Sequence, residues 1–207
     1  VRAFSLPIVG LCHSIQHTAT QLSEYLEVPE EAMDWQVAGI NHLAWFLQLE
    51  HEGRDLYPRL RKCAENPKLY DRDPVRFDMM LHLGAFSTET SGHASEYVPY
   101  YRKRPELLER YTRSGFQGQS GFYAAFWPLW RMESDRQLGE VIAGNAEHTL
   151  ERGLEYASYI VEAIENDDPT VIYGNVVNTG LIDNLDQGGV VEVACLVDKH
   201  GVQPTHY

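Results

Sequence analysis

The sequence predicts an α+β fold: mixed helices with a small, mostly antiparallel sheet, forming a single domain over residues 1–207. Two stretches, 15–27 and 122–165, space apolar residues by three and four, as amphipathic helices do. Two others, 35–50 and 170–198, combine β-branched and aromatic residues with polar turn signals. No Gly-x-Gly-x-x-Gly motif joins a strand to a helix, so a doubly wound, dinucleotide-binding sheet is not expected.

The first half of the chain alternates short helices with a broken pair of strands. The helix over 15–27 ends before Pro29, because the residue preceding a proline disfavours helical geometry. The run 35–50 is interrupted at Asn41-His42, so we expect two strands with His42 at the turn. Two further short helices are expected at 55–66 and 74–83.

The second half opens on a stretch without a sustained period. Residues 86–121 crowd hydroxyls, a histidine, carboxylates and tyrosines together, a density typical of a loop that carries a site. Helical spacing returns over 122–165, where Gly139 and Gly144 favour a division into two helices. The final strands are expected to be joined by polar turns at 178–180 and 187–189.

Composition limits the partners and the compartment. The 17 basic and 30 acidic residues give a net charge of −13, which repels nucleic acid and anionic membranes, so neither is an expected partner. No apolar run approaches the roughly 20 residues of a membrane span, and the first residues lack the pattern of a signal peptide. The 3 cysteines match neither a disulfide framework nor a zinc finger. We therefore expect a cytoplasmic protein.

Cys12 and His42 are candidate metal ligands. A thiolate and an imidazole both suit a divalent transition metal, and each stands at the end of a predicted element, where coordination positions can stay open to a ligand. His13 follows the cysteine, just ahead of the first helix. The same residue types occur as ordinary packing and turn residues, so this spacing alone does not decide between the two interpretations.

A second group of candidates lies further along the chain. A tyrosine acts as a general base only when a nearby positive charge stabilises its phenolate, so Tyr97 or Tyr100 would need a charged neighbour. His93 and Glu96 are candidates for substrate contact, although an aromatic packing surface is the alternative for this tyrosine-rich stretch. Asn178 would either offer its amide to ligand hydroxyls or hold a turn.

Four segments share one resemblance: VGLCHS (9–14), AGINHLAWF (38–46), TETSGHASEYVPYYRKRPE (88–106), and NVVNTGLIDNL with VVEVACLVDKHGVQPT (175–205). In this order and at these separations they resemble glycoside hydrolase family 4. The resemblance implies a C-terminal substrate and metal domain like that of these glycosidases and of lactate and malate dehydrogenases. It also implies a fragment that is truncated at both ends and lacks the family's N-terminal NAD-binding domain.

The resemblance implies roles residue by residue. Cys12 and His42 match the family's manganese ligands. Tyr97, with Tyr100 as the alternative, matches the catalytic base. His13 stands where the phospho-glycosidase branches carry Asp or Asn, and it resembles the branch acting on unphosphorylated α-galactosides, α-glucosides or α-glucuronides. His13 is also the candidate acid for departure of the leaving group. The NAD-binding residues would belong mainly to the absent domain.

The implied activity is hydrolysis of α-linked unphosphorylated glycosides, with α-galactosides first among them. It would proceed by NAD-dependent oxidation at C3, removal of the C2 proton and elimination, assisted by Mn²⁺ or a similar divalent metal. A small sugar and further copies of the chain, in a dimer or tetramer, are the expected partners. Two alternatives stay open: a non-catalytic sugar-binding or assembly module of the same fold, and half of a hydroxyacid-dehydrogenase-like oxidoreductase.

Overall fold

A computed structural model describes residues 8–112, 122–147 and 151–207. The helices of these ranges are α1 (Ser14–Leu26), the 3-10 helix η1 (Glu30–Ala32), α2 (Tyr57–Glu65), α3 (Pro67–Tyr70), α4 (Pro74–Leu83), α5 (Ser91–Tyr97), α6 (Pro105–Thr112), α7 (Phe122–Ile142) and α8 (Ala157–Asn166). The strands are β1 (Gly10–Leu11), β2 (Met33–Ile40), β3 (Leu43–His51), β4 (Arg54–Asp55), β5 (Phe86–Ser87), β6 (Thr170–Val177), β7 (Val190–Asp198) and β8 (Gly201–Pro204).

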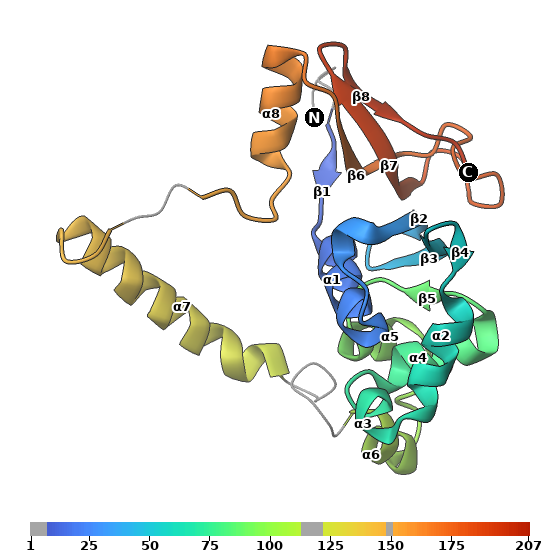
Figure 1. Ribbon diagram of the computed structural model, residues 1–207. Helices are drawn as coiled ribbons and strands as arrows, with labels where there is room; N and C mark the ends of the chain where they lie inside the picture. The colour runs from blue at the N-terminus through green and yellow to red at the C-terminus, as the bar shows by residue number, and fades with distance from the viewer. Residues whose placement is uncertain (1–7, 113–121, 148–150) are drawn as a thin grey trace.

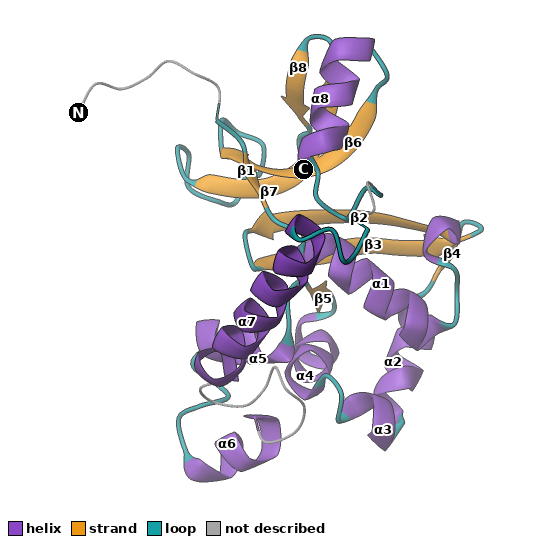
Figure 2. Ribbon diagram, turned by 90° about the vertical axis from the view of Figure 1, so that its left-hand side faces the viewer, coloured by secondary structure: helices purple, strands orange, loops and turns teal. Residues whose placement is uncertain are grey.

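The strands form one antiparallel sheet in the order β1-β6-β7-β2-β3-β4, with β5 paired to β3 and β8 to β7. This order places β1, near the start of the chain, beside β6 from its last part, with Gly10 opposite Asn175. Figure 2 shows β1, β6 and β7 above β2 and β3, with α1 and α2 below these two strands. The expected α+β class with an antiparallel sheet is confirmed.

Helices cover both faces of the sheet. Val37 belongs to the core formed with α1, α2 and α4, where Leu22, Leu60 and Phe77 are fully buried. Ala38, the next residue on β2, belongs instead to the core formed with α8. Successive residues of a strand point to opposite faces, so α1 and α8 lie on opposite sides of the sheet. Figure 1 shows the same division, with α8 beside β6 and α1, α2 and α4 near β2 and β3.

Most predicted elements occur where they were expected. The predicted helix over 15–27 is α1, the strand break at Asn41-His42 is the β2–β3 turn, and the helical stretch 122–165 divides into α7 and α8. Helix α7 extends away from the sheet and from the other helices (Figure 1), and its side chains described from residue 124 onward are almost all exposed. Within the described ranges, no helix has both the length and the apolar character to cross a membrane.

The expectation of an irregular loop over 86–121 is wrong for the described residues up to 112. Helix α5 begins after Thr90, whose Oγ1 accepts a hydrogen bond from the His93 backbone N–H at 3.2 Å. Helix α6 begins at Pro105. These short helices depend on a capping side chain and on burial of Ala94 and Tyr111 beside α4, and such helices are too short to show a period. Residues 113–121 lie outside the described part of the chain.

Candidate metal centre

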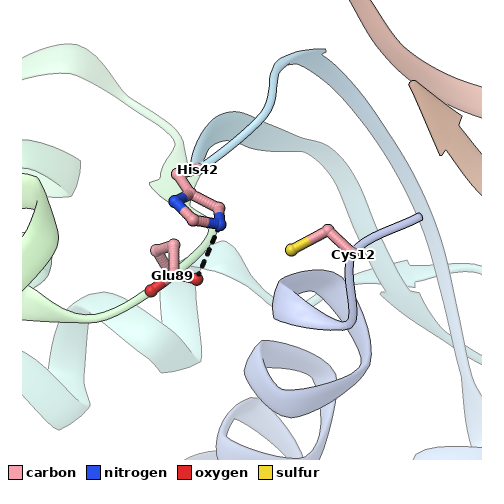
Figure 3. A group of neighbouring side chains, drawn as sticks. All are labelled: Cys12, His42 and Glu89. Atoms are coloured by element: carbon pink, nitrogen blue, oxygen red, sulfur yellow. Dashed lines mark ion pairs between the residues drawn. The ribbon is translucent and has the colours of Figure 1, made fainter. Parts of the chain in front are cut away.

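Three side chains from separate parts of the chain converge at one end of α1. Cys12 lies between β1 and α1, His42 in the β2–β3 turn, and Glu89 between β5 and α5. One ligand atom from each, Sγ, an imidazole nitrogen and a carboxylate oxygen, lies within 4.8 Å of the other two. Figure 3 shows the sulfur of Cys12 and the carboxylate of Glu89 directed toward the same edge of the His42 ring. The sheet and helix termini thus place three potential metal ligands around one point.

Two of these residues adopt an unusual backbone conformation. His42 has φ 63° and Glu89 has φ 69°, both in the left-handed region that non-glycine residues rarely occupy. Each such residue costs of order 1 kcal/mol or more, and such strain concentrates at ligand sites. The turn and the loop therefore keep these two side chains in place at an energetic cost, as a binding or catalytic centre would.

Glu89 is the negative centre of a small charged group. Its Oε1 lies 3.4 Å from His42 Nε2 and its Oε2 lies 3.1 Å from His93 Nδ1. Burial by itself raises the pKa of Glu89, but the hydrogen bond from His93 and the charges of the two histidines outweigh burial and lower the pKa below its usual value. The same hydrogen bond raises the pKa of His93. Glu89 is therefore a carboxylate at neutral pH.

Tyr97 contacts the centre and Tyr100 does not. The Tyr97 hydroxyl lies 2.9 Å from His42 Nδ1, on the side of the ring opposite the nitrogen that faces Glu89. Tyr97 is 48% exposed, so its hydroxyl group is in reach of a ligand. Tyr100 is 66% exposed and packs its ring against Tyr101. Of the two candidate tyrosines, the structure brings only Tyr97 to the proposed metal ligand.

The structure gives each of three further predicted residues its own contacts. The His93 ring is 5.5 Å from the His42 ring, so His93 belongs to the group. His13 is the N-cap residue of α1, and its ring centroid lies 4.6 Å from that of His17. The exposed Glu96 side chain lies 3.7 Å from Arg102.

Asn178 holds its own loop. Its side chain is 1% exposed, and its Oδ1 accepts hydrogen bonds from three backbone N–H groups, those of Gly180, Leu181 and Ile182. Its Nδ2 donates to backbone carbonyls of the same loop, including that of Ile182. Because the amide is buried and already paired on both sides, the geometry fits the turn-holding alternative and leaves no group free for a ligand.

A cleft of about 280 Å³ opens beside Glu89. Its lining residues are Ser14, His17, Thr20, Gln21, Glu89, Thr90 and Leu154. The lining offers hydroxyl, amide, imidazole and carboxylate groups, and among its residues in the described part of the chain there is no lysine or arginine. Partial burial, together with the neighbouring His13, lowers the pKa of His17, which keeps this ring neutral near pH 7. The described lining of the cleft is therefore largely polar.

The three converging residues fit a divalent transition metal. Such ions lie about 2.0–2.3 Å from thiolate, imidazole and carboxylate ligands, so two ligands of one ion are at most roughly 4.6 Å apart. The ligand atoms of Cys12, His42 and Glu89 lie within 4.8 Å of one another, which is close to this maximum separation. A carboxylate beside the thiolate also suits a hard ion such as Mn²⁺ better than a site made of sulfur alone.

A buried polar network lies beside the segment that carries Glu89. We call it the polar clamp; it consists of Arg76, Asp73, Ser91, Thr18 and Gln21. Arg76 of α4 is 1% exposed and donates from Nε to Asp73 at 2.8 Å and from Nη1 to Thr18 at 3.1 Å. Ser91, at the start of α5, donates to the same aspartate and accepts from the backbone N–H of Val75 at 3.1 Å. The polar clamp thus ties α1, α4 and α5 together beside the metal centre.

Glu89 was not among the residues predicted from the sequence. It lies inside the matched segment 88–106, but a glutamate between two threonines has no pattern of its own. Its position depends on the pairing of β5 with β3, which sets Ser87 opposite Trp45 and so brings the following loop to the β2–β3 turn. The one available signal was its place in the same matched segment as His93 and Tyr97.

Comparisons with known proteins identify the family of this chain. The family 4 glycosyl hydrolase C-terminal domain matches residues 37–207. An α-galactosidase of Bacillus subtilis (strain 168) is 36% identical over 214 residues, which cover 99% of this chain and 46% of that protein. The chain spans about half the length of the curated relatives it matches.

Two solved structures show the same fold. A Bacillus subtilis protein assigned as a glucosidase, lplD, superposes with a TM-score of 0.77 at 22% identity, over 95% of this chain and 49% of that one. A 6-phospho-α-glucosidase from gut microorganisms, solved with NAD and Mn²⁺, gives 0.70 at 19% identity, over 97% of this chain and 47% of that one. With the match over 37–207, these findings show that the chain belongs to family 4 of the glycosyl hydrolases, as its C-terminal half.

Proposed function

We propose that this chain is the metal- and sugar-binding half of an enzyme that hydrolyses α-linked, unphosphorylated glycosides, with α-galactosides as the first candidates. One observation carries the proposal: the ligand atoms of Cys12, His42 and Glu89 meet within 4.8 Å of one another, with the Tyr97 hydroxyl on the far side of the His42 ring. The α-galactosidase relative at 36% identity supports the choice of substrate.

The proposed cofactors are Mn²⁺, or a similar divalent ion, and NAD. When bound, the metal would supply Lewis acidity toward sugar oxygens and NAD would accept a hydride from C3. Cys12, His42 and Glu89 would hold the metal. NAD would be bound mainly by residues beyond this chain. The solved 6-phospho-α-glucosidase that holds NAD and Mn²⁺ has the same fold.

Tyr97 is the proposed base for the C2 proton. If His42 held the metal through Nε2, the ring proton would reside on Nδ1, and Nδ1–H would donate to the Tyr97 oxygen, which lies 2.9 Å away. A donor at this position stabilises the phenolate, which is the form that accepts a proton. The elimination then needs an acid at the leaving group, and His13 at the exposed start of α1 is proposed for that role.

The cleft supports an unphosphorylated substrate. A sugar phosphate needs cationic partners, and the lining residues beside Glu89 that the structure describes include neither lysine nor arginine. Glu89, a carboxylate facing the same cleft, would repel a phosphate group. The hydroxyl groups of Ser14 and Thr20, and the amide nitrogen of Gln21, whose Oε1 accepts from Arg76, would instead pair with sugar hydroxyls. His93, next to Glu89, and Glu96 on the same helix are proposed as further substrate contacts.

The proposal extends to assembly and compartment. Helix α7 exposes Trp127, Leu129 and Met132 at 57% or more, an apolar surface that an interface between copies of this chain would bury, so we propose a dimer or tetramer. Cys12, Cys63 and Cys195 are all free thiols, which fits the reducing cytoplasm proposed as the site of action.

The first experiment compares two cysteine variants of the intact protein. Hydrolysis of an aryl α-galactoside is measured with NAD, Mn²⁺ and a reductant present, and again with each omitted. We expect Cys12→Ser to lose activity and to weaken Mn²⁺ binding by more than about 100-fold, because a ligand costs more than the roughly 10–100-fold of an outer hydrogen-bond partner. Cys63→Ser, a half-buried thiol on α2, should behave as the unmodified protein.

Two results would contradict the proposal. Hydrolysis that continues at full rate without NAD and metal would exclude the redox route. With a substrate deuterated at C2, retention of deuterium in the product would exclude removal of the C2 proton. Mn²⁺ binding that survives Cys12→Ser in a protein without activity would favour a sugar-binding or assembly module instead.

A further inference from the structure

Glu192 of β7 is a buried carboxylate that the proposed chemistry does not use. Its side chain is 0% exposed, and within the described chain neither of its carboxylate oxygens has a hydrogen-bond partner. The Oδ1 atom of Asn175, its neighbour on β6, is likewise buried and unpaired. A buried acceptor left in this state costs about 1–3 kcal/mol, so a role other than packing is the better explanation for a charged group here.

The sheet places Glu192 between the two segments that carry Cys12 and His42. In one row across the strands, Gly10 pairs with Asn175, Asn175 with Glu192, and Glu192 with Gly39. Cys12 follows soon after the first residue of this row and His42 soon after the last. Residues paired across strands point to the same face. The segments that carry the two metal ligands therefore begin at opposite ends of this row, and Asn175 and Glu192 lie between them.

The row is closely packed at the end that leads to Cys12. A Cβ atom at Gly10 would lie 3.0 Å from the Cβ of Asn175, so any larger residue here would force the Asn175 side chain to shift by a few tenths of an ångström. Asn175 Nδ2 also donates to the Gly10 carbonyl at 3.4 Å. The position of β1, and with it the position of Cys12, thus depends on the Asn175 side chain.

The other end of the row leads to His42 through Asn41. Burial raises the pKa of Glu192 to about 7; the charge of Glu89 adds to the shift, and the side-chain amides of Asn175 and Asn41 oppose it. Both amides are therefore near the carboxylate, although neither meets it in full hydrogen-bonding geometry. Asn41 directly precedes His42 in the β2–β3 turn. Glu192 thus lies between one amide that holds the Cys12 strand and one that belongs to the His42 turn.

We propose that Glu192 is a positioning residue of the metal centre: between Asn175 and Asn41, its carboxylate sets the separation of the Cys12 thiolate from the His42 imidazole. It acts through these amides and is not one of the three converging ligands. The inference rests on the proposed function, because it takes Cys12 and His42 as metal ligands. Glutamine at this position would fill the same volume. Its NH₂ group would replace one acceptor oxygen with a donor that faces the amides of Asn175 and Asn41, which would weaken the contact with these two residues.

The test measures binding of Mn²⁺ alone to the metal-free intact protein, by the electron paramagnetic resonance signal of the free ion. We expect Glu192→Gln to weaken Mn²⁺ binding about 10–100-fold, the usual effect of removing a residue that orients a ligand. Asn41→Ala, at an exposed turn position, should show a loss of the same size. Glu165→Gln, an exposed carboxylate on α8, is the matched control and should leave the affinity unchanged.

Thermal unfolding of the metal-free variants separates positioning from a structural role. Neutralising a buried, unpaired carboxylate should leave the unfolding temperature of Glu192→Gln equal to that of the unmodified protein or higher, so weaker metal binding cannot come from partial unfolding. If Glu192→Gln does not fold, Asn41→Ala decides: weakened binding supports the proposal and unchanged binding overturns it.

The outcomes also distinguish the two proposals. Unchanged Mn²⁺ affinity in Glu192→Gln and Asn41→Ala, with binding still lost in Cys12→Ser, would overturn the positioning role and leave the proposed function in place. A loss confined to Glu192→Gln would overturn the connection through Asn41. If the unmodified protein binds no Mn²⁺, the proposed function fails and the positioning role fails with it.

Discussion

Two polar clusters meet near the start of α5, and they differ in how fully their polar groups are hydrogen-bonded within the protein. In the polar clamp, the Arg76 guanidinium donates to Asp73, Thr18 and Gln21, and Asp73 also accepts hydrogen bonds from Ser91 and Tyr25. In the metal centre, Cys12, His42 and Glu89 face one another with more than a hydrogen-bond length between the His42 and Glu89 atoms, and two of the three have left-handed backbones.

This difference separates structural polar groups from functional ones. A network whose donors and acceptors are all paired within the protein makes the packing unique and has little left to offer a ligand. Ligand atoms held by a strained backbone, and not fully paired, stay available to an ion or substrate. Glu192 belongs with the second kind, because its oxygens are buried and unpaired. Each of the following predictions tests one side of the distinction.

The largest effect is expected in the polar clamp. Arg76→Met keeps an unbranched side chain of similar length but leaves the Asp73 carboxylate, 2% exposed, without its cation. Breaking a buried ion pair in this way typically costs about 3–5 kcal/mol of unfolding free energy. Urea unfolding of the metal-free protein would measure the loss.

An exposed pair between α1 and the turn before α4 provides the control. Arg72 donates to Glu24 at 2.8 Å, with both side chains about half exposed. Arg72→Met should cost less than about 1 kcal/mol, because water screens exposed ion pairs. Equal costs for Arg72→Met and Arg76→Met would show that the polar clamp contributes no more than a surface pair, and the distinction drawn above would not hold.

The fold could be predicted where a local pattern decides it. The spacing of Ala19, Leu22 and Leu26 places α1, and all three are fully buried. The β2–β3 turn follows from Asn41-His42. Helix α5 could not be predicted, because its seven residues owe their conformation to the Thr90 cap and to contacts with α4. Short helices held by tertiary contacts have no sequence period to detect.

Only part of the candidate site could be predicted from the sequence. The resemblance singled out Cys12 and His42, and the structure brings them together. Glu89 depends on the long-range pairing of β5 with β3, which composition and spacing do not encode. Arg76 looks like an ordinary residue of an amphipathic helix, and only the fold reveals that it is buried against Asp73. Glu89 and Arg76 could not be predicted because their positions depend on contacts between segments that are distant in the sequence.

The second prediction concerns Glu192 and pH. The carboxyl group has an ordinary pKa of 4.5 in the unfolded chain and about 7 in the folded protein. Between these values the unfolded chain has lost the proton while the folded protein retains it, so stability falls as pH rises and levels off above about pH 7. Relative to Glu192→Gln, the unmodified protein should lose about 3 kcal/mol of unfolding free energy over this range.

Urea unfolding with a chelator present, repeated between pH 4.5 and pH 8, measures this difference. If the free-energy gap between the two proteins stayed constant with pH, the carboxylate would have to be paired in the folded state, and Glu192 would belong with the polar clamp. Glu165→Gln, which removes an exposed carboxylate on α8, is the matched control.

The smallest effect is expected at Thr90, the residue that joins the two clusters. Thr90 follows Glu89 of the metal centre, precedes Ser91 of the polar clamp, and caps α5 by accepting the His93 backbone N–H at 3.2 Å. Thr90→Ala should lower the unfolding free energy by about 1 kcal/mol, the usual cost of losing such a cap. Thr90→Ser keeps the acceptor oxygen and should retain most of the stability. If the cap also sets the direction of Glu89, Thr90→Ala weakens Mn²⁺ binding while Thr90→Ser does not; equal Mn²⁺ affinities in both variants would mean that Glu89 is held by its histidine partners alone.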